Sequence, residues 1–206
     1  MLVALAPDHE FTTPRTQFEP DIEDIFARVP ASITTKGMFF NAALTLAEDP
    51  VSADDLLRAA GLEPERLLSF TDYPWVDFLR LNVAIGDLLC AGDRAIGMRR
   101  VGRTLYSEFA DSPVGRMLFG LLRYNADRVI GMGATAWNMS GGPGEVQAVS
   151  VGDCHYHYHF SGYPSDVTET LGIGVLEGAL HACNEVARVS FARADAMHGV
   201  VDIQWG

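Results

Sequence analysis

The sequence predicts an α+β protein in which an N-terminal helical bundle or sheath packs with a C-terminal β-β-α-β-β antiparallel four-stranded sheet. Apolar residues recur at helical spacing through residues 21–139. After residue 140 the pattern changes to strand-like alternation, and two hairpin patterns flank one helical pattern. We therefore expect a single α+β domain over residues 21–206, helical in 21–139 and sheet-containing in 140–206. Residues 1–20 carry Pro7, Pro14 and Pro20 with neither period, which indicates a flexible N-terminal arm.

Helical signals follow one another in the first part of the chain. An apolar stripe begins at Ile22 and stops at Pro30, and residues 35–44 form a second apolar helical pattern. Ser52 precedes Asp55 by three residues, as in a capping box, and opens a helix that we expect to end before Gly61. Further helices are expected from Pro64 onward and at residues 74–91, 94–109, 113–124 and about 127–139.

The C-terminal third begins with a hairpin pattern. Residues 145–151 alternate as a strand, Gly152 and Asp153 give a turn signal, and residues 154–160 return as a second strand. Pro164 and Ser165 then open a helix that runs to about residue 183. A closing hairpin is expected from residues 186–193 and 200–205.

Three histidines occupy alternate positions of the second predicted strand. A strand points alternate side chains to opposite faces, so His155, His157 and His159 share one face. Imidazole is a common transition-metal ligand and changes charge near neutral pH. This stripe predicts either a metal site, for zinc or a similar ion, or a proton-sensitive surface. Glu145 and Asp153 are the candidates for a further ligand.

The opposite face of the same strand is apolar and supports a different reading. Tyr156, Tyr158 and Phe160 lie on it, and they could form the buried side while the histidines are merely hydrated. The sequence leaves open which face is buried. With the tyrosine face inside, an apolar pocket is expected between the sheet and the long helix. Its lining would be Trp75, Phe78, Leu79, Tyr156, Tyr158 and Phe160.

One basic cluster interrupts an otherwise acidic chain. Arg99 and Arg103 fall on one helical face at four-residue spacing, beside Arg100. Two guanidinium groups so placed can clamp a carboxylate or phosphate. They can equally pair with acidic side chains of the protein itself, and the sequence does not separate these alternatives.

Composition excludes several classes of partner. A formal charge of −12 disfavours nucleic acid and electrostatic docking on an anionic membrane. No apolar run is long enough to span a bilayer, and the apolar start lacks the positive region of a signal peptide. Three widely spaced cysteines match neither a disulfide framework nor a zinc ribbon. These features predict a cytoplasmic protein.

Several short motifs, in order, resemble a known family. They are Thr34-Thr35-Lys36-Gly37-Met38-Phe39-Phe40, Gly102-Arg103-Thr104-Leu105-Tyr106, Gly115-Arg116, Gly174-Val175-Leu176-Glu177-Gly178-Ala179-Leu180 and Val201-Asp202-Ile203-Gln204-Trp205. Over about residues 28–206 the chain resembles a myxobacterial paralogous family of unknown function, distantly similar to the haem-NO-binding and 4-vinyl-reductase sensor fold. The resemblance implies an α/β fold with a pocket between helices and sheet, and it supplies no reaction.

The chain departs from the cofactor motifs of that wider fold. Haem-binding members carry a helical proximal histidine and a Tyr-x-Ser-x-Arg motif, whereas this chain has Tyr106-Ser107-Glu108 and one histidine, His181, on a predicted helix. The clustered cysteines of the 4-vinyl-reductase type are also missing. The resemblance therefore does not imply haem for this chain.

Three functional hypotheses follow. The first is a non-enzymatic sensory or signalling module that binds a small hydrophobic molecule. The second is a metal-binding protein, or a metalloenzyme, built on the histidine stripe. The third is a homodimeric interaction adaptor. The sequence does not decide whether the protein is an enzyme, although it contains no nucleophile elbow, phosphate loop or dinucleotide fingerprint, which favours the non-enzymatic hypotheses.

Overall fold

The N-terminal part of the protein is helical. A computed structural model describes residues 20–64, 67–111, 116–117 and 125–206. The elements of this part are α1 (Ile22–Arg28), β1 (Thr34–Lys36), α2 (Gly37–Leu44), α3 (Ala53–Ala59), β2 (Asp72–Pro74), α4 (Trp75–Leu89), α5 (Arg94–Asp111) and α7 (Ala126–Ser140). The expected arm, apart from Pro20, and most of the helix expected at 113–124 lie outside the described residues.

The C-terminal part forms the predicted sheet. Its strands are β3 (Glu145–Gly152), β4 (His155–Ser161), β5 (Arg188–Arg193) and β6 (His198–Gln204), all paired antiparallel in the spatial order β3-β4-β6-β5. Between the two hairpins lie α8 (Ser165–Val167), a π-helical turn (Thr168–Gly172) and α9 (Ile173–Ala182). The predicted α+β class and the β-β-α-β-β order are confirmed.

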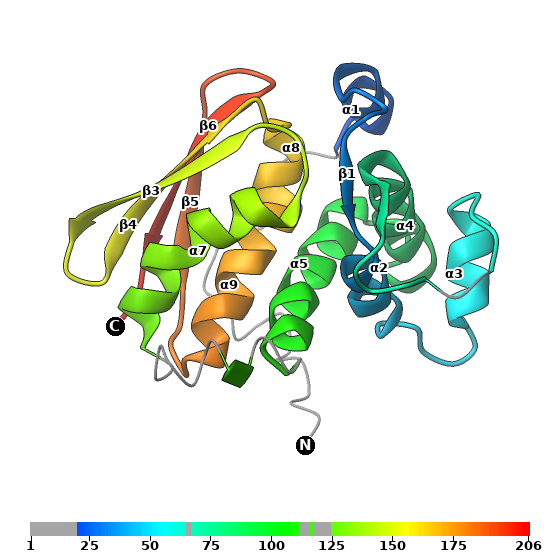
Figure 1. The fold of residues 1–206 in the computed structure, drawn as a ribbon, viewed down its shortest axis with the longest axis horizontal. Coiled ribbons are helices and arrows are strands. Elements are labelled where there is room, and N and C mark those ends of the chain that lie inside the picture. The colour runs from blue at the N-terminus through cyan, green and yellow to red at the C-terminus, as the bar shows by residue number, and fades with distance from the viewer. Residues whose placement is uncertain (1–19, 65–66, 112–115, 118–124) are drawn as a thin grey trace.

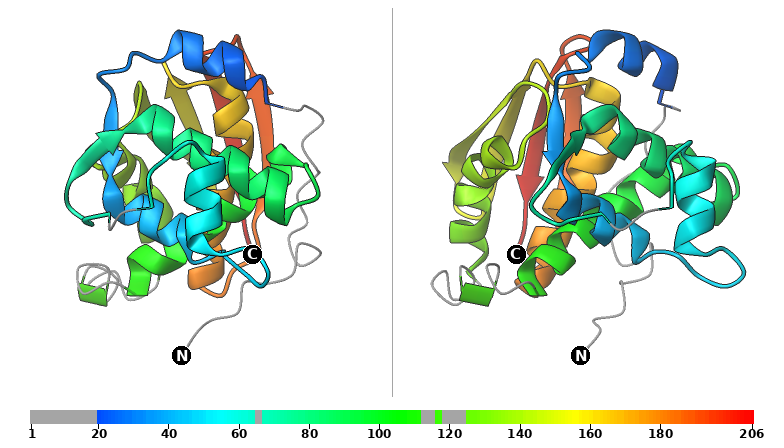
Figure 2. Two further views of the ribbon diagram at one scale, coloured as in Figure 1. Left: turned by 90° about the vertical axis from the view of Figure 1, so that its right-hand side faces the viewer. Right: turned by 45° about the vertical axis from the view of Figure 1, so that its right-hand side comes forward.

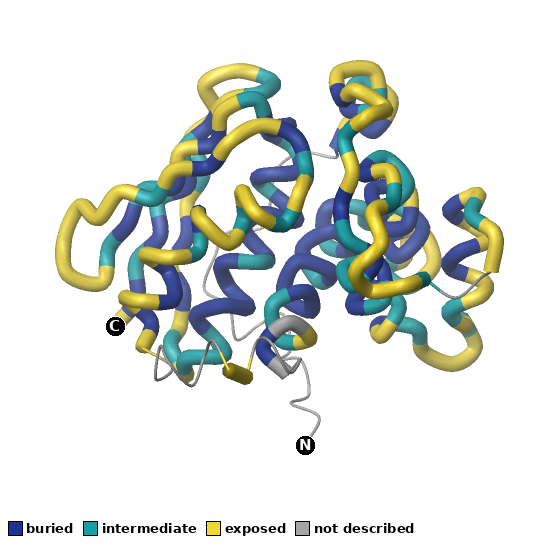
Figure 3. Tube along the Cα trace, in the orientation of Figure 1, coloured by how far each residue is buried: buried dark blue, intermediate teal, exposed yellow. Residues whose placement is uncertain are grey.

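The elements are arranged in layers. Figure 1 shows α7 and α9 against one face of the four-stranded sheet, with α5 on the far side of α9. The turned views of Figure 2 show α2, α3 and α4 farther from the sheet than α5. Buried residues gather along α9, α5 and α4 in Figure 3. A single core cluster runs from Ile22 of α1 to Trp205 after β6. The apolar core therefore connects the helical part with the sheet.

One predicted helix is wrong. Residues 67–71, where a helix from Pro64 would continue, form a turn that leads into β2. Their backbone serves the start of α2 instead: the amides of Gly37 and Met38 donate to the carbonyls of Thr71 and Ser69, both at 2.9 Å. The first amides of a helix have no partner inside the helix, so this turn supplies one from a distant segment.

Two smaller features were not predicted. β1 and β2 pair antiparallel, with Thr35 opposite Tyr73, and form a two-stranded sheet. The helix expected between the two hairpins is interrupted by the π-helical turn. Neither feature has a periodic signal in the sequence, because three-residue strands are too short to alternate and a π-helical turn keeps an apolar helical pattern.

Candidate functional site

The inner face of β4 is the tyrosine face. Tyr156, Tyr158 and Phe160 are buried, which answers the question that the sequence left open. The Tyr158 hydroxyl donates to the Ile130 carbonyl in α7. Gly133 of α7 allows this approach, because a Cβ atom there would lie 2.5 Å from the Tyr158 oxygen. Burial raises the pKa of Tyr158, so this hydroxyl stays protonated at neutral pH.

The outer face of β4 carries the histidines. His155 Nε2 lies 2.5 Å and His157 Nε2 lies 3.2 Å from the same atom, Oδ1 of Asp202. Asp202 comes from β6, where it stands opposite His157 in the strand register. The side chains of His155, His157 and Asp202 are 28%, 38% and 36% exposed. Two imidazoles and one carboxylate therefore converge on a point that water can reach.

The remaining residues of the predicted stripe do not join this point. His159 pairs with Val200, and its ring centre lies 6.2 Å from that of His157. Among the described residues, the group of three histidine, cysteine or acidic side chains whose donor atoms all lie within 4.8 Å of one another is His155, His157 and Asp202. Glu145, proposed from the sequence as a further ligand, stands opposite Ser161 at the other end of the strand pair. The acidic side chain next to the histidines is therefore Asp202, whereas the sequence suggested Glu145 or Asp153.

Arg99 and Arg103, which the sequence left as candidates for anion binding or for pairing with the protein's own acids, are buried. Arg99 donates to both oxygens of Glu177, from Nη2 at 2.5 Å and from Nε at 3.1 Å. Arg103 Nε donates to Glu177 Oε2 at 2.8 Å. The Glu177 side chain is 0% exposed and the two guanidinium-bearing side chains are 9% and 7% exposed. The geometry favours an internal ion pair between α5 and α9 over capture of an external anion.

The helices that hold this ion pair are in unusually close contact. A Cβ atom at Gly178 of α9 would lie 2.6 Å from the Arg103 carbonyl oxygen of α5. Cβ atoms at Gly102 and Gly174 would collide with the carbonyl oxygens of Leu171 and Arg99. Glycine at these three positions lets the two backbones touch. No room for a bound molecule remains at this contact.

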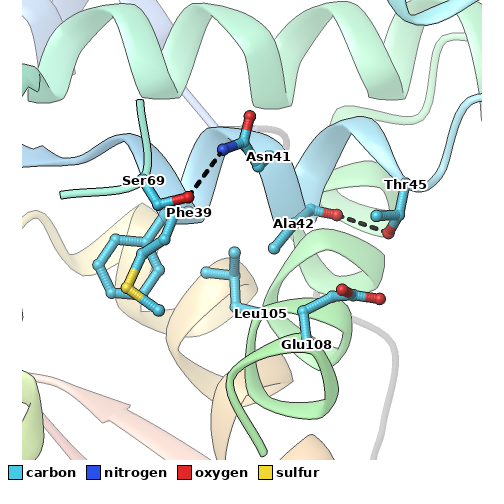
Figure 4. Close-up of a pocket in the computed structure, with 8 residues that line it drawn as sticks. Phe39, Asn41, Ala42, Thr45, Ser69, Leu105 and Glu108 are labelled. Atoms are coloured by element: carbon cyan, nitrogen blue, oxygen red, sulfur yellow. Dashed lines mark hydrogen bonds between the residues drawn. The ribbon is translucent and has the colours of Figure 1, made fainter. Parts of the chain in front are cut away.

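A cavity of about 210 Å³ lies on the other side of α5, between α5 and α2. Its lining is Met38, Phe39, Asn41, Ala42, Thr45, Ser69, Leu105 and Glu108. Figure 4 shows Leu105 and Glu108 extending from α5 toward Ala42 and Thr45. Asn41 Nδ2 donates to the Leu67 carbonyl at 3.2 Å and lies 3.4 Å from Ser69 Oγ, which ties the turn before β2 to α2.

The residues expected to line an apolar pocket lie in the core. All six are 9% exposed or less, and none of them lines the cavity between α2 and α5. Phe78 is adjacent to it, since its ring centre is 6.5 Å from that of Phe39, a lining residue. Trp75 and Phe160 meet through Tyr163, at 5.8 Å and 5.6 Å between ring centres. A ligand pocket at these six residues stays a prediction.

Asp202, Glu177 and the residues of the cavity were missed as functional candidates. The alternation of residues 201–205 placed Val201, Ile203 and Trp205 on one face, so Asp202 and Gln204 had to lie on the other. What the sequence lacked was the pairing of β4 with β6, which brings Asp202 opposite His157. The cavity has no local signal, because its residues come from three separate segments.

The thiol groups differ in environment. Cys154 is exposed in the turn between β3 and β4, whereas Cys183 is partly buried after α9. Burial first, and then the charge of Glu185, raises the pKa of Cys183 to about 11. The Cys183 thiol is therefore mostly protonated at neutral pH, which slows its reaction as a nucleophile.

Comparisons with known proteins agree with this fold. Residues 28–206 match the family described as "Protein of unknown function (DUF2378)". No curated protein matches the chain. In the described part of the chain, no helix combines the length and the apolar character that a bilayer crossing requires.

Several solved H-NOX proteins share this fold. The H-NOX protein from S. oneidensis in the Fe(II)NO state is 14% identical, with a TM-score of 0.64 over 83% of this chain and 99% of that chain. A point mutant of the K. algicida H-NOX protein in the unliganded Fe(II) state gives 17% and 0.61 over 83% and 96%. A point mutant of the T. tengcongensis H-NOX protein gives 17% and 0.60 over 82% and 97%. These likenesses confirm the predicted resemblance to the haem-NO-binding fold at the level of fold.

Proposed function

We propose a ligand-binding, sensory function for this chain, which belongs to the DUF2378 family of proteins of unknown function. The ligand would be a small organic molecule held in the cavity between α2 and α5, and no bond would be made or broken there. The cavity itself carries this proposal. The shared fold gives it context, because the solved H-NOX proteins include one in an Fe(II)NO ligation state.

The size of the cavity limits the ligand. An apolar cavity of about 150 Å³ in another protein holds benzene. At about 210 Å³, this cavity suits a molecule somewhat larger than benzene, such as a ring with one or two substituents. The cavity is partly open to solvent, so a larger molecule would extend out of it.

The lining determines the chemistry of the ligand. Met38, Phe39, Ala42 and Leu105 offer apolar surface, while Glu108 and Thr45 offer oxygen atoms. Small-molecule sites typically have a mostly apolar lining with a few polar groups at defined positions. Because Glu108 is acidic and the chain has a formal charge of −12, a neutral or cationic hydrogen-bond donor is favoured over an anion.

Haem, the cofactor of the haem-binding members of this fold, does not fit the described residues. Axial haem ligands are most often histidine, cysteine, methionine or tyrosine, and the cavity offers only Met38 from this set. Four of the five described histidines lie on strands, and the fifth, His181, lies in the last turn of α9. The α5–α9 contact is closed by glycine backbones and by the Arg99–Glu177–Arg103 ion pair. We therefore carry no haem chemistry over to this chain.

Ligand-observed NMR tests the cavity. Phenol and aniline serve as small donor probes, and benzoate serves as an anionic control of similar size. We expect saturation transfer to phenol and aniline and a weaker transfer to benzoate. Ala42→Leu fills part of the cavity from α2, so it should remove binding of both donor probes.

The matched control is Ala59→Leu, which adds the same side chain at an exposed position of α3. It should bind both probes as the wild type does, and circular dichroism should show that both variants fold. Equal binding by Ala42→Leu and the wild type would place the ligand elsewhere. Absence of binding by the wild type would contradict the assigned chemistry.

A further inference from the structure

The geometry points to a binding site for one divalent transition-metal ion on the outer face of the sheet, with His155, His157 and Asp202 as ligands. This site is separate from the cavity between α2 and α5. It lies on the opposite face of the sheet from α7, because the tyrosine face of β4 packs on α7. It would exist whether or not the cavity binds a ligand.

The donor atoms are already placed around one point. Two ligands of a tetrahedral zinc ion, each about 2.1 Å from the metal, lie about 3.4 Å from each other. His157 Nε2 and Asp202 Oδ1 are 3.2 Å apart, which is close to this spacing. His155 Nε2 is 2.5 Å from the same oxygen, so a metal would require these two groups to separate by somewhat less than 1 Å. Side-chain rotation on an open strand face can supply that change.

The backbone fixes these positions in advance. β4 and β6 pair without a bulge from His155–Gln204 to Ser161–His198, with His157 opposite Asp202 within that register. Facing residues on paired strands have Cβ atoms about 4.5–5.5 Å apart. The site would thus be assembled by two central strands of the sheet rather than by a loop, which lowers the entropy lost on binding.

Gln204 offers a further oxygen at the same place. Its side-chain amide nitrogen lies 3.2 Å from His155 Nε2, and that ring nitrogen also contacts Asp202. One imidazole nitrogen cannot donate to the carboxylate and accept from the amide at the same time. Turning the amide by half a rotation brings its carbonyl oxygen toward His155 Nε2. A cation at this nitrogen would then face the oxygens of both Asp202 and Gln204.

The donor set selects the class of metal. Two imidazole nitrogens with one carboxylate suit zinc, cobalt, nickel or copper, whereas calcium and magnesium prefer sites made of oxygen alone. The exposed fractions of 28% to 38% leave space for a water molecule or an exogenous ligand to complete the coordination. An ion bound here would also join β4 to β6 through their side chains.

Zinc titration of the full chain, purified without a histidine tag, tests the site. Isothermal titration calorimetry should give one zinc ion per chain for the wild type. His157→Ala and Asp202→Asn should each weaken zinc binding by at least about tenfold. Calcium at the same concentration should give no heat of binding.

The matched control is His159→Ala, which removes a histidine from the same face of the same strand but outside the converging group. It should bind zinc as the wild type does. If His159→Ala weakened zinc binding as much as His157→Ala, any histidine of the strand would contribute equally, and the assignment of these three ligands would be overturned. Wild-type protein without a zinc isotherm would overturn it as well.

A second measurement guards against misfolding of the variants. Zinc should raise the Tm of the wild type and of His159→Ala, because a ligand that binds only the native state stabilises it. At the same zinc concentration the increase in Tm should be much smaller for Asp202→Asn. A Tm increase in Asp202→Asn as large as that of the wild type would show that the ion binds elsewhere, for instance at the exposed pair of His198 and Asp195.

Discussion

Two clusters in this protein each join two basic side chains to one carboxylate, but one cluster is buried and the other is partly exposed to solvent. In each, two basic side chains converge on one carboxylate: Arg99 and Arg103 on Glu177, and His155 and His157 on Asp202. The first is 0% to 9% exposed between α5 and α9, and the second is 28% to 38% exposed on the open face of the sheet. Burial, not the kind of contact, separates the two.

The difference determines what each cluster can do. Inside the protein, no water is at hand to replace a lost partner, so the arginine–glutamate pair fixes how α5 and α9 pack. On the sheet face, water can take the place of any of the three groups, so the histidine–aspartate group can open and exchange its occupant at little cost. The first cluster is a structural element, and the second has the freedom that a binding site needs.

Among these substitutions, Glu177→Gln should lower the free energy of unfolding the most. It leaves two buried guanidinium groups facing a neutral amide, and loss of one partner from a buried ion pair costs about 3–5 kcal/mol. We expect that decrease in the free energy of unfolding, measured by urea denaturation. Asp202→Asn in metal-free buffer is the counterpart and should change it by less than about 1 kcal/mol. Equal losses in the two variants would contradict the comparison.

A double-mutant cycle on the inner face of β4 should show an intermediate effect. Gly133→Ala puts a methyl group 2.5 Å from the Tyr158 oxygen and should cost about 1–3 kcal/mol in free energy of unfolding. In a Tyr158→Phe background the nearest ring atom is 3.5 Å away, an ordinary contact. There Gly133→Ala should stabilise α7, by up to about 1 kcal/mol, because alanine favours helix.

The open face supplies the control for this cycle. Gly152→Ala, at the end of β3, places its methyl group 3.7 Å from the Cβ atom of His155, with nothing closer. We expect a change of no more than about 0.5 kcal/mol. If Gly133→Ala were equally well tolerated in the wild-type background, the inner face would not be tightly packed around Tyr158.

The last comparison concerns the reaction rates of an exposed and a partly buried thiol, and it involves no loss of stability. In a Cys90→Ser background the exposed Cys154 should react with an aromatic disulfide reagent at pH 8. Cys183, with a pKa raised to about 11 by burial, should react at least about tenfold more slowly. Raising the pH toward 9 should speed the slow phase, since the thiolate fraction grows. Two equal rates would show that Cys183 is as accessible as Cys154.

Much of the fold could be predicted because its signals are local. The alternation of residues 154–160 and the capping pair Ser52 and Asp55 specify a strand and a helix start within a few residues, and both are present. The turn at 67–71 could not be predicted, because its structure depends on hydrogen bonds to Gly37 and Met38 about thirty positions earlier.

In the candidate site, too, residues near in sequence could be predicted and distant partners could not. His155 and His157 were found because they are near in sequence, whereas Asp202 joins them across 47 and 45 positions through the β4–β6 pairing. For Arg99 and Arg103 the sequence left open whether they bind an external anion or pair with acidic side chains of the protein itself. Their partner, Glu177, is 78 positions from Arg99 and 74 from Arg103, and the packing of α5 on α9 brings it close.

The position of α5 has a mechanical consequence. Its Leu105 and Glu108 line the cavity, and its Arg99 and Arg103 are bound to α9, with glycine backbones in contact along the way. We expect two helices joined in this way to shift together, because sliding would separate a buried ion pair. An occupant that pushes α5 away from α2 would therefore move α9 as well, and strain would reach the sheet without any flexible link between the two.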